Sequence, residues 1–352
     1  MEQFGLIGYG GMGEYHLQQI NSLPGFAVSA IYDIDPEKRQ KARDNGYVVF
    51  DSREEFLEQG AFETVVVAVP NNFHKDCAIA AMRTGKHVIC EKPVMLCSAD
   101  LIEVLAVSRQ TGMQFSAHQN RRWDRDFTIV RKCLADGSIG KPFYIESRVQ
   151  GSKGIPGDWR CTRASGGGML LDWGIHLLDQ IMYLTGSPVA EVYAHLLQVK
   201  FSEVDDNFKV LLRFENGLSA LIEVDTYTFI PLPRWHISGD NGTLQIDNFE
   251  CDGKIVHAKN SEIHWEEGIV YTAAGPTRTM APRPIETIEE CALPTVQTDA
   301  RDYYVNFCNA LHGTEQLIVT PREMIAVMRV VDAIFKSANE HRAVAPESSE
   351  NK

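Results

Sequence analysis

The sequence predicts an α/β fold in two parts: an N-terminal doubly wound parallel sheet, and a C-terminal α+β domain with a large, open-faced, mainly antiparallel sheet. Up to about residue 119, short apolar runs alternate with helical stretches, as in strands buried on both faces. Beyond residue 120, longer strands alternate apolar with polar residues, which indicates one buried face. A length of 352 residues suits two domains of ~100–200 residues each. We therefore expect domains at 1–120 and 121–343 and a flexible tail at 344–352.

The first half contains five apolar runs that we interpret as strands. They lie at residues 4–10, 26–33, 64–70, 87–93 and 114–118. A helix over 16–23 follows the first run, and helical segments precede the third and fourth runs. Apolar strands separated by helices are typical of a doubly wound parallel sheet.

The second half combines alternating strands with four expected helices. Strands are expected at 141–150, 189–199, 208–229 and 234–247, and helices at about 124–136, 172–185, 300–312 and 321–340. Glu-Asn-Gly at 215–217 and Asp-Asn-Gly at 240–242 are typical of hairpin turns, so neighbouring strands should run antiparallel. The helices should cover this sheet or return to the first domain. Residues 251–298 are weakly patterned and receive no assignment.

Composition and charge argue against several classes of function. The formal net charge of −13 repels phosphate backbones and anionic lipid surfaces, so we expect no nucleic-acid or membrane partner. No segment approaches the ~20 apolar residues that span a bilayer, and the N-terminus lacks the pattern of a secretory signal. The eight cysteines form no CxxC pair, which favours reduced thiols over disulfides or a zinc site. We expect a cytoplasmic protein without a bound metal.

A glycine-rich turn between the first strand and the first helix indicates a dinucleotide site. Glycines let the backbone approach a pyrophosphate, whose charge is met by the free N–H groups of the helix start. The turn residues expected to bind the cofactor are Gly8, Gly10, Gly11, Met12 and Gly13. Asp33 ends the second strand, ~20 residues or slightly more further on, where a carboxylate can bind the ribose hydroxyls. This anion favours NAD over NADP, and the nearby Lys38 and Arg39 keep NADP as the second candidate.

A second signature is more specific than the glycine turn. Residues 67–94 read VAVPNNFHKDCAIAAMRTGKHVICEKPV, followed by RRWD at 121–124 and GGGMLLDWGIH at 166–176. In this order and at these spacings, the sequence resembles the glucose–fructose oxidoreductase / inositol dehydrogenase / MocA family. The resemblance implies a Rossmann domain, an open-faced sheet domain and an active site between them.

The resemblance also implies roles for residues near the strand ends. It places Glu91 near the nicotinamide ribose and Lys92 between cofactor and substrate, with a Lys92–Pro93 bond that is often cis in relatives. Pro70 and Asn71 would line the same pocket at the carboxyl edge of the sheet, where doubly wound folds bind ligands.

The residues suited to acid–base chemistry are Lys92, Asp172 and His176. Oxidising an alcohol requires a base for the hydroxyl proton while hydride leaves carbon, and histidine titrates near neutrality. Asp172 and His176 stand four residues apart, so they share one face if their segment is α-helical. We expect His176 to accept the proton, Asp172 to orient the imidazole or hold a substrate hydroxyl, and Lys92 to stabilise alkoxide character. The alternative is a helix-face pair and a surface lysine.

Arginine and tryptophan side chains are candidates for substrate contacts, because they can bind hydroxyl groups and stack on a sugar ring. With one asparagine, this set comprises Asn120, Arg121, Arg122, Trp159, Arg160 and Trp235. The alternative for the arginines is a surface ion pair, and for the tryptophans a place in the core. His16, His74 and His118 are interpreted as packing or strand-end residues, and no cluster has metal-ligand spacing.

Three functions are compatible with these patterns. The first is a dehydrogenase or ketone reductase that uses NAD(P) on a secondary hydroxyl or ketone of a cyclitol, sugar or sugar derivative, as in inositol dehydrogenases. The second is an NAD-dependent glycoside-cleaving enzyme that works by transient sugar oxidation and elimination. The third is a non-catalytic NAD-binding regulator, against which the retention of Lys92, Asp172 and His176 argues. We also expect a homo-oligomer, a dimer or tetramer, formed through an exposed sheet face.

Overall fold

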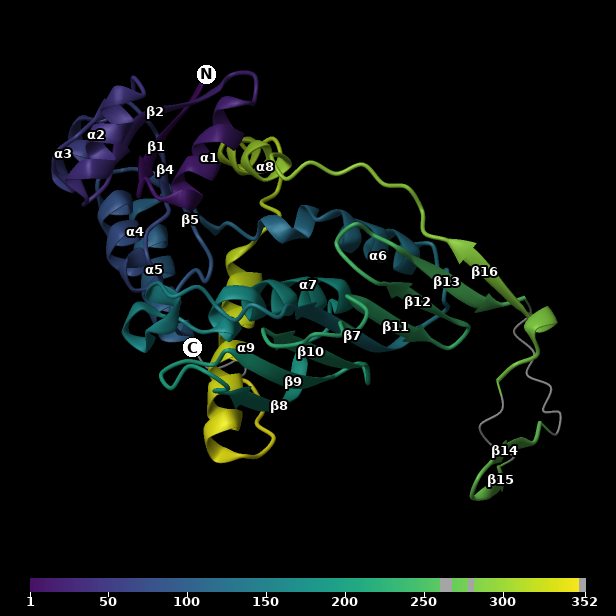
Figure 1. Ribbon diagram of the computed structural model, residues 1–352. Helices are drawn as coiled ribbons and strands as arrows, with labels where there is room; N and C mark the ends of the chain where they lie inside the picture. The colour runs from purple at the N-terminus through teal and green to yellow at the C-terminus, as the bar shows by residue number, and fades with distance from the viewer. Residues whose placement is uncertain (260–267, 278–281, 348–352) are drawn as a thin grey trace.

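The computed structural model describes residues 1–259, 268–277 and 282–347, and it contains two large β-sheets with helices packed on them (Figure 1). The first sheet has six parallel strands in the order β3-β2-β1-β4-β5-β6. Its strands and helices are β1 (Glu2–Ile7), α1 (Gly11–Asn21), β2 (Phe26–Tyr32), α2 (Pro36–Asp44), β3 (Val48–Val49), α3 (Arg53–Gln59), β4 (Thr64–Val67), α4 (His74–Arg83), β5 (His87–Cys90), α5 (Ser98–Thr111) and β6 (Phe115–Ala117). The strand order reverses between β1 and β4, and ligands bind such sheets at the carboxyl edge of this switch point.

The predicted parallel sheet is confirmed, with one additional strand. Val65 and Val66 of β4 and Ile89 of β5 have no exposed surface, as expected of strands covered by helices on both faces. The sequence pattern misses β3, because its two residues, Val48 and Val49, are too short a run to show a period.

The second sheet has eight strands in the order β16-β13-β12-β11-β7-β10-β9-β8. Its strands and the helices of this half are α6 (Arg125–Ala135), β7 (Pro142–Gln150), α7 (Ile175–Thr185), β8 (Val189–Leu197), β9 (Asn207–Phe214), β10 (Ser219–Asp225), β11 (Trp235–Gly239), β12 (Gly242–Ile246), β13 (Gly253–Ala258), β16 (Ile288–Ala292), α8 (Asp302–Leu311) and α9 (Pro321–Glu340). Within this sheet β7 and β10 pair in parallel and the other described pairs are antiparallel, as predicted.

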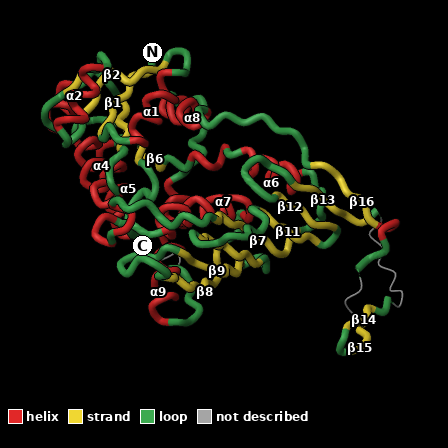
Figure 2. Tube along the Cα trace, in the orientation of Figure 1, coloured by secondary structure: helices red, strands yellow, loops and turns green. Residues whose placement is uncertain are grey.

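Two parts of the chain differ from expectation. The unassigned segment 251–298 contributes β13, the edge strand β16 and a hairpin of β14 (Val270–Thr272) and β15 (Gly275–Thr277), which projects from the sheet in Figure 2. All five residues of β16 are at least partly exposed, so its apolar pattern is weak. The flexible tail that the sequence predicts begins at Val344. This residue is instead buried, and it forms two backbone hydrogen bonds of 2.8 Å with Val192. Residues 348–352 lie outside the described residues.

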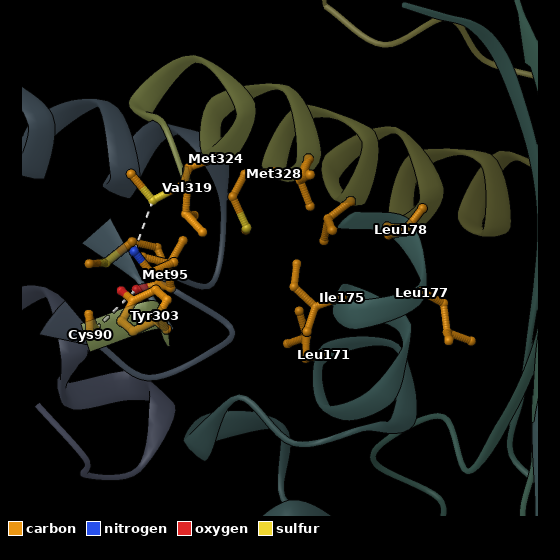
Figure 3. Packing of buried hydrophobic residues seen from close by; sticks show 14 of the residues in the cluster. Cys90, Met95, Leu171, Ile175, Leu177, Leu178, Tyr303, Val319, Met324 and Met328 are labelled. Carbon is orange, nitrogen blue, oxygen red and sulfur yellow. Dashed lines mark hydrogen bonds between the residues drawn. The ribbon is translucent and has the colours of Figure 1, made fainter. Parts of the chain in front are cut away.

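The last two helices return to the first domain. Helix α8 lies beside α1 in Figure 1, and Tyr304 on α8 contacts His16 on α1. Helix α9 begins with a capping box, in which Thr320 Oγ1 accepts a hydrogen bond from Glu323 N. Figure 3 shows Met324 of α9 on the side of the first domain, with the residues of α7 opposite. In the described ranges, no helix combines the length and the apolar character needed to cross a membrane.

Candidate active site

The glycine turn between β1 and α1 has the tight backbone that a dinucleotide site needs. Gly8 has a φ of +97°, and a Cβ there would lie 2.2 Å from a backbone carbonyl oxygen. A Cβ on Gly13 would lie 2.0 Å from Gly8 O, so both positions require glycine. An added Cβ on Gly11 would meet nothing within 4 Å, and Met12 is 39% exposed. The outer side of the turn, at Gly10 and Gly11, is therefore open for a pyrophosphate at the start of α1.

Asp33 follows β2 directly and lies beside the glycine turn, as the sequence predicts. Its side chain is almost fully buried, and its oxygens accept hydrogen bonds from the backbone N–H groups of Tyr9 (2.6 Å) and Asp35 (2.8 Å). The carboxylate therefore also fixes the shape of the turn. The Lys38 Nζ lies 4.0 Å from Asp33 Oδ2, and it is the nearest atom to an added Cβ on Gly10. Because this cation offsets the carboxylate, the pair does not repel the 2′-phosphate of NADP as a lone anion would.

The turn after β4 connects the first domain to the glycine run of the second. Pro70 and Asn71 follow this strand at the same sheet edge as the glycine turn. Asn71 is buried, and its Nδ2 donates a 2.8 Å hydrogen bond to Gly166 O. Asn71 thus holds the two domains together at the rim of the region predicted for the cofactor.

Lys92 and Asp172 come from different domains and meet between them. Lys92 follows β5, and its bond to Pro93 is cis. Its Nζ donates hydrogen bonds to Asp172 Oδ1 (2.7 Å) and Asp172 O (2.9 Å). Arg160 Nε lies 3.6 Å from the other carboxylate oxygen, and its guanidinium also binds Asp158. The Lys92 and Asp172 side chains are 17% and 21% exposed, so this ion pair is accessible to a ligand.

The segment that carries Asp172 is a π-helical turn rather than the predicted α-helix. The turn covers Leu170–Gly174 and continues into α7 at Ile175. Its hydrogen bonds run from residue i to i+5, so side chains four residues apart no longer align. The expected pair does not form: Asp172 binds Lys92, and among the described residues no hydrogen bond joins it to His176. Single π turns are frequent at functional sites.

Asp205 holds the start of this turn and is absent from the predicted site residues. Its Oδ2 accepts a 2.7 Å hydrogen bond from Leu170 N, and its backbone oxygen accepts one of 2.9 Å from Met169 N. Gly168 has a φ of +106°, and a Cβ there would lie 2.3 Å from Asp205 Oδ1. Burial raises the pKa of Asp205 to about 7. The only sequence signal for this role is the polar run DDNF at 205–208.

His176 is a buried imidazole with a free nitrogen. It is 4% exposed, and its Nδ1 has no hydrogen-bond partner in the described part of the chain. Its ring packs 6.1 Å from the ring of Trp173. Burial, together with the positive charges of Lys92 and Arg121, holds the pKa of His176 well below 6.5. The imidazole is therefore neutral at physiological pH and able to accept a proton.

Glu91 is the centre of a buried polar network. Its Oε1 lies 2.8 Å from His16 Nε2 and 2.9 Å from His118 Nδ1, and its Oε2 accepts a 3.1 Å hydrogen bond from Lys92 N. Tyr304 OH lies 2.7 Å from the other ring nitrogen of His16. The family resemblance places Glu91 near the nicotinamide ribose. In the structure, its carboxylate is hydrogen-bonded to protein groups and the residue is only 5% exposed.

The same network shows what residue spacing cannot reveal. The ligand-type atoms of His16, Glu91 and His118 lie within 4.8 Å of one another, so the fold assembles a cluster that no sequence spacing indicates. The direct N···O distances of 2.8 and 2.9 Å are those of hydrogen bonds, and the cluster is satisfied without a metal ion.

A cavity of about 660 Å³ adjoins Asp172 at the carboxyl ends of β7 and β10. The loop 151–156 forms one part of its lining, and Met169 and Trp173 form another. Arg160 also lines it. Sites for small molecules have volumes of roughly 300–1,000 Å³, so a single sugar or cyclitol fits this cavity.

Two of the predicted substrate residues, Arg160 and Arg121, lie close to this cavity, and a third, Trp159, packs on Arg160 without lining it. Arg160 lines it and stacks 4.6 Å from the ring of Trp159. Arg121 lies 4.1 Å from the ring centre of Trp173, a lining residue that is absent from the predicted set. These two arginines place positive charge around Asp172 and His176.

Three others are engaged elsewhere. Arg122 is buried and forms two 2.7 Å hydrogen bonds to the carboxylate of Asp179. Trp235 is fully buried and donates a 2.9 Å hydrogen bond to Asp126. Asn120 forms a side-chain hydrogen bond with a tyrosine hydroxyl of α1. Arg122 and Trp235 therefore stabilise the core of the second domain and do not line the cavity.

Comparison with known proteins assigns both halves of the chain to one family. Residues 3–119 match the model described as an oxidoreductase family with an NAD-binding Rossmann fold. Residues 127–245 match the GFO/IDH/MocA C-terminal domain. The chain belongs to the GFO/IDH/MocA oxidoreductase family. This GFO/IDH/MocA protein is an NAD(P)-dependent dehydrogenase.

Similar proteins cover between 70% and 98% of the GFO/IDH/MocA chain. It is 26% identical to scyllo-inositol 2-dehydrogenase (NADP(+)) IolW of Bacillus subtilis (strain 168) over 346 residues, 97% of this chain and 94% of that protein. It is 28% identical to myo-inositol 2-dehydrogenase of Thermotoga maritima over 254 residues, 70% of this chain and 75% of that protein. The solved structure of an NAD-binding protein from Listeria innocua is 41% identical, with a TM-score of 0.94 and coverage of 98% and 99%.

Proposed function

We propose that this GFO/IDH/MocA protein oxidises a secondary hydroxyl group of a cyclitol, sugar or sugar derivative, or reduces the matching ketone, with NAD(P) as the hydride carrier. One observation carries the proposal: Asp172, which is ion-paired with Lys92, lines a cavity, and the neutral imidazole of His176 lies close enough to Lys92 to be affected by its charge. The relatives named as inositol dehydrogenases support a polyol substrate.

Each of the three side chains has a distinct task in this reaction. The Lys92 ammonium donates a hydrogen bond to the reacting oxygen and stabilises its alkoxide character. His176, whose imidazole is neutral, accepts the hydroxyl proton. Asp172 orients Lys92 through the 2.7 Å contact. NAD(P), held by the glycine turn and Asp33, supplies the hydride acceptor.

The charges of the cavity favour a neutral polyol. Asp172 is paired with Lys92 and lies beside Arg160, and Asp225 accepts a 2.9 Å hydrogen bond from Gln150. The lining also contains Lys153, so its two cationic side chains, Lys153 and Arg160, balance its two carboxylates, while its hydrogen-bonding groups can bind hydroxyls. Trp173 adds the apolar surface on which a sugar or cyclitol ring can pack.

A spectrophotometric screen of inositols, aldoses, sugar acids and glycosides with NAD and NADP tests the proposal. We expect reduced nicotinamide to form with a cyclitol or sugar. His176→Asn and Lys92→Met should each lower kcat by about 10²–10⁴-fold. Lys141→Met, at an exposed position before β7, is the matched control and should keep wild-type activity.

Two results would count against this function. Cleavage of glycosides without net formation of NADH would indicate transient oxidation and elimination instead. Firm cofactor binding without turnover on the whole panel would indicate a regulatory protein.

A further inference from the structure

The polar run at 205–207 contacts two parts of the cavity lining. Asp205, Asp206 and Asn207 are buried, and Asn207 is the first residue of β9. Buried polar side chains normally have hydrogen-bond partners, so their contacts show which segments they hold in place. One end of the run binds the segment that carries Asp172, and the other end binds the residue after β10. The run therefore links two segments that line the proposed substrate site.

Asp205 holds the segment that fixes Lys92. Its backbone oxygen accepts a 2.9 Å hydrogen bond from Met169 N, and its Oδ2 accepts one of 2.7 Å from Leu170 N, at the start of the π turn. The Lys92 Nζ donates to the backbone oxygen of Asp172 as well as to its carboxylate. A displacement of the turn therefore moves both acceptors of the Lys92 ammonium at once.

Asn207 holds the loop on another part of the lining. Its Oδ1 accepts a 2.7 Å hydrogen bond from Thr226 N, and Thr226 Oγ1 donates a 3.0 Å hydrogen bond to the backbone oxygen of Asp206. The backbone oxygen of Thr226 accepts a 2.9 Å hydrogen bond from Gly154 N, in the loop 151–156. Thr226 and Gly154 both line the cavity, so Asn207 positions this loop through one lining residue.

We propose that Asp205 and Asn207 are positioning residues that act on different parts of the reaction. Asp205 aligns Lys92 for the chemical step by holding the π turn. Asn207 shapes the loop 151–156, which binds the substrate. The inference rests on the proposed function, because the reaction defines these two tasks. In the described part of the chain, neither side chain is among those that line the cavity, so both act through other residues.

The two tasks affect different kinetic constants. The Lys92 ammonium stabilises charge that develops only in the transition state, so its misplacement lowers kcat. A misplacement of about 1 Å is enough to lower a rate 10²-fold. The loop 151–156 contacts the substrate before and during the reaction, so its displacement raises KM and leaves kcat unchanged.

Asp205→Ala tests the first task. We expect kcat to fall about 10–100-fold with the polyol that gives the highest rate in the screen. The affinity for NAD⁺, measured by calorimetry, should stay within about twofold, because the glycine turn lies in the other domain. Asp205→Asn keeps an acceptor oxygen for Leu170 N and should restore kcat to within about threefold of the wild type.

Acylation of Lys92 tests the same displacement without turnover. The Lys92 side chain is 17% exposed and held by Asp172, so its release should make the amine more accessible. Modification by acetic anhydride, quantified at Lys92 by peptide mass spectrometry, should increase severalfold in Asp205→Ala and remain at the wild-type level in Asp205→Asn. If Asp205→Ala does not fold, Asp205→Glu moves the acceptor by one methylene group, and we expect the same changes.

Asn207→Ala tests the second task. We expect KM for the polyol to rise about fivefold with kcat unchanged. Lys153 is exposed in the loop, so cleavage by trypsin after this residue should become faster. Asn216→Ala is the matched control, because Asn216 Oδ1 accepts a 3.1 Å hydrogen bond from Leu218 N in the turn between β9 and β10, at the opposite end of these strands. It should keep wild-type kcat, KM and trypsin cleavage after Lys153.

The outcomes separate this proposal from the proposed function. Wild-type kcat and Lys92 acylation in Asp205→Ala, or a loss that Asp205→Asn does not restore, would overturn the role of Asp205. A fall in kcat with unchanged KM in Asn207→Ala would overturn the role of Asn207. Absence of turnover on every polyol would count against the proposed function, whereas the acylation and trypsin experiments would still decide whether the two residues hold these segments.

Discussion

His176 works as a base only while its imidazole is neutral, and its surroundings keep it neutral over a wide pH range. Burial, Lys92 and Arg121 hold its pKa well below 6.5. We therefore expect His176 to cause no loss of kcat/KM for oxidation between about pH 8 and 6.5, and a loss only at lower pH. Arg121→Gln removes one positive charge, so it should raise the pKa of His176 and move this acid limb upward by up to about one unit. A pH–rate profile measures the shift.

Substitution of a second arginine, far from His176 in the sequence, is the control for Arg121→Gln. It distinguishes an effect on the pKa of His176 from a general effect of losing one positive charge. Arg109→Gln, at an exposed position of α5, should leave the acid limb at its wild-type pH. Arg121 also packs on Trp173, so its removal can lower kcat by disturbing the cavity wall. A fall in kcat at every pH without movement of the limb would contradict the electrostatic account.

Single residues differ in how far their roles follow from sequence. The glycine turn and Lys92 are identifiable because each belongs to a short sequence motif that directly follows an apolar strand. The network of Glu91 is not, since His16 and His118 come from α1 and the end of β6 and meet only in the folded chain. The burial of Arg122 does not follow from sequence for the same reason, because its partner Asp179 belongs to α7.

At the level of elements, the π turn Leu170–Gly174 sets the direction of Asp172, and Gly168 allows it to form. Gly168→Ala would place a side chain at φ +106° with its Cβ 2.3 Å from Asp205 Oδ1. We expect this change to destabilise the protein by about 1–3 kcal/mol and to lower kcat/KM, because it displaces Asp172 from Lys92. Urea unfolding and steady-state kinetics measure the two effects.

Gly157→Ala is the control for this prediction. Gly157 lies in the preceding loop, its φ is outside the positive range and an added Cβ meets nothing within 4 Å. This variant should keep wild-type stability and activity. Wild-type behaviour of Gly168→Ala would show that the turn does not depend on the glycine.

Helical periodicity predicts α6, α8 and α9 to within two residues, but it cannot distinguish an α-helix from a π turn. The extra residue in the turn is accommodated through tertiary contacts. Asp205 accepts the N–H of Leu170, and the neighbouring backbone oxygen accepts that of Met169. Neither contact can be inferred from the apolar periodicity of residues 170–185.

For the whole molecule, the two-sheet architecture is predictable because the two sheets impose different patterns on the chain. Strands covered on both faces are continuously apolar, whereas β9 alternates buried and exposed residues along its length. The edge strand β16 and its neighbour β13 escape prediction, since partly exposed strands carry little apolar pattern. Helix α9 packs against α5 and α7 in the folded chain, and Figure 3 shows its side chains facing those of α7. The sequence does not indicate which faces of these helices meet.

The open face of the second sheet leads to a prediction about assembly. Helices α6 and α7 lie on one side of this sheet in Figure 1, and Tyr193 and Leu211, paired on β8 and β9, remain 48% and 45% exposed. Exposed apolar side chains gathered on a sheet face are typical of interfaces, so we expect a homo-oligomer, a dimer or tetramer, with this face between copies. Leu211→Glu should therefore lower the mass measured by light scattering toward that of a monomer. Val48→Glu, which adds the same charge at an exposed apolar residue of the first sheet, should leave the mass unchanged. A monomeric wild type at micromolar concentration would contradict the prediction.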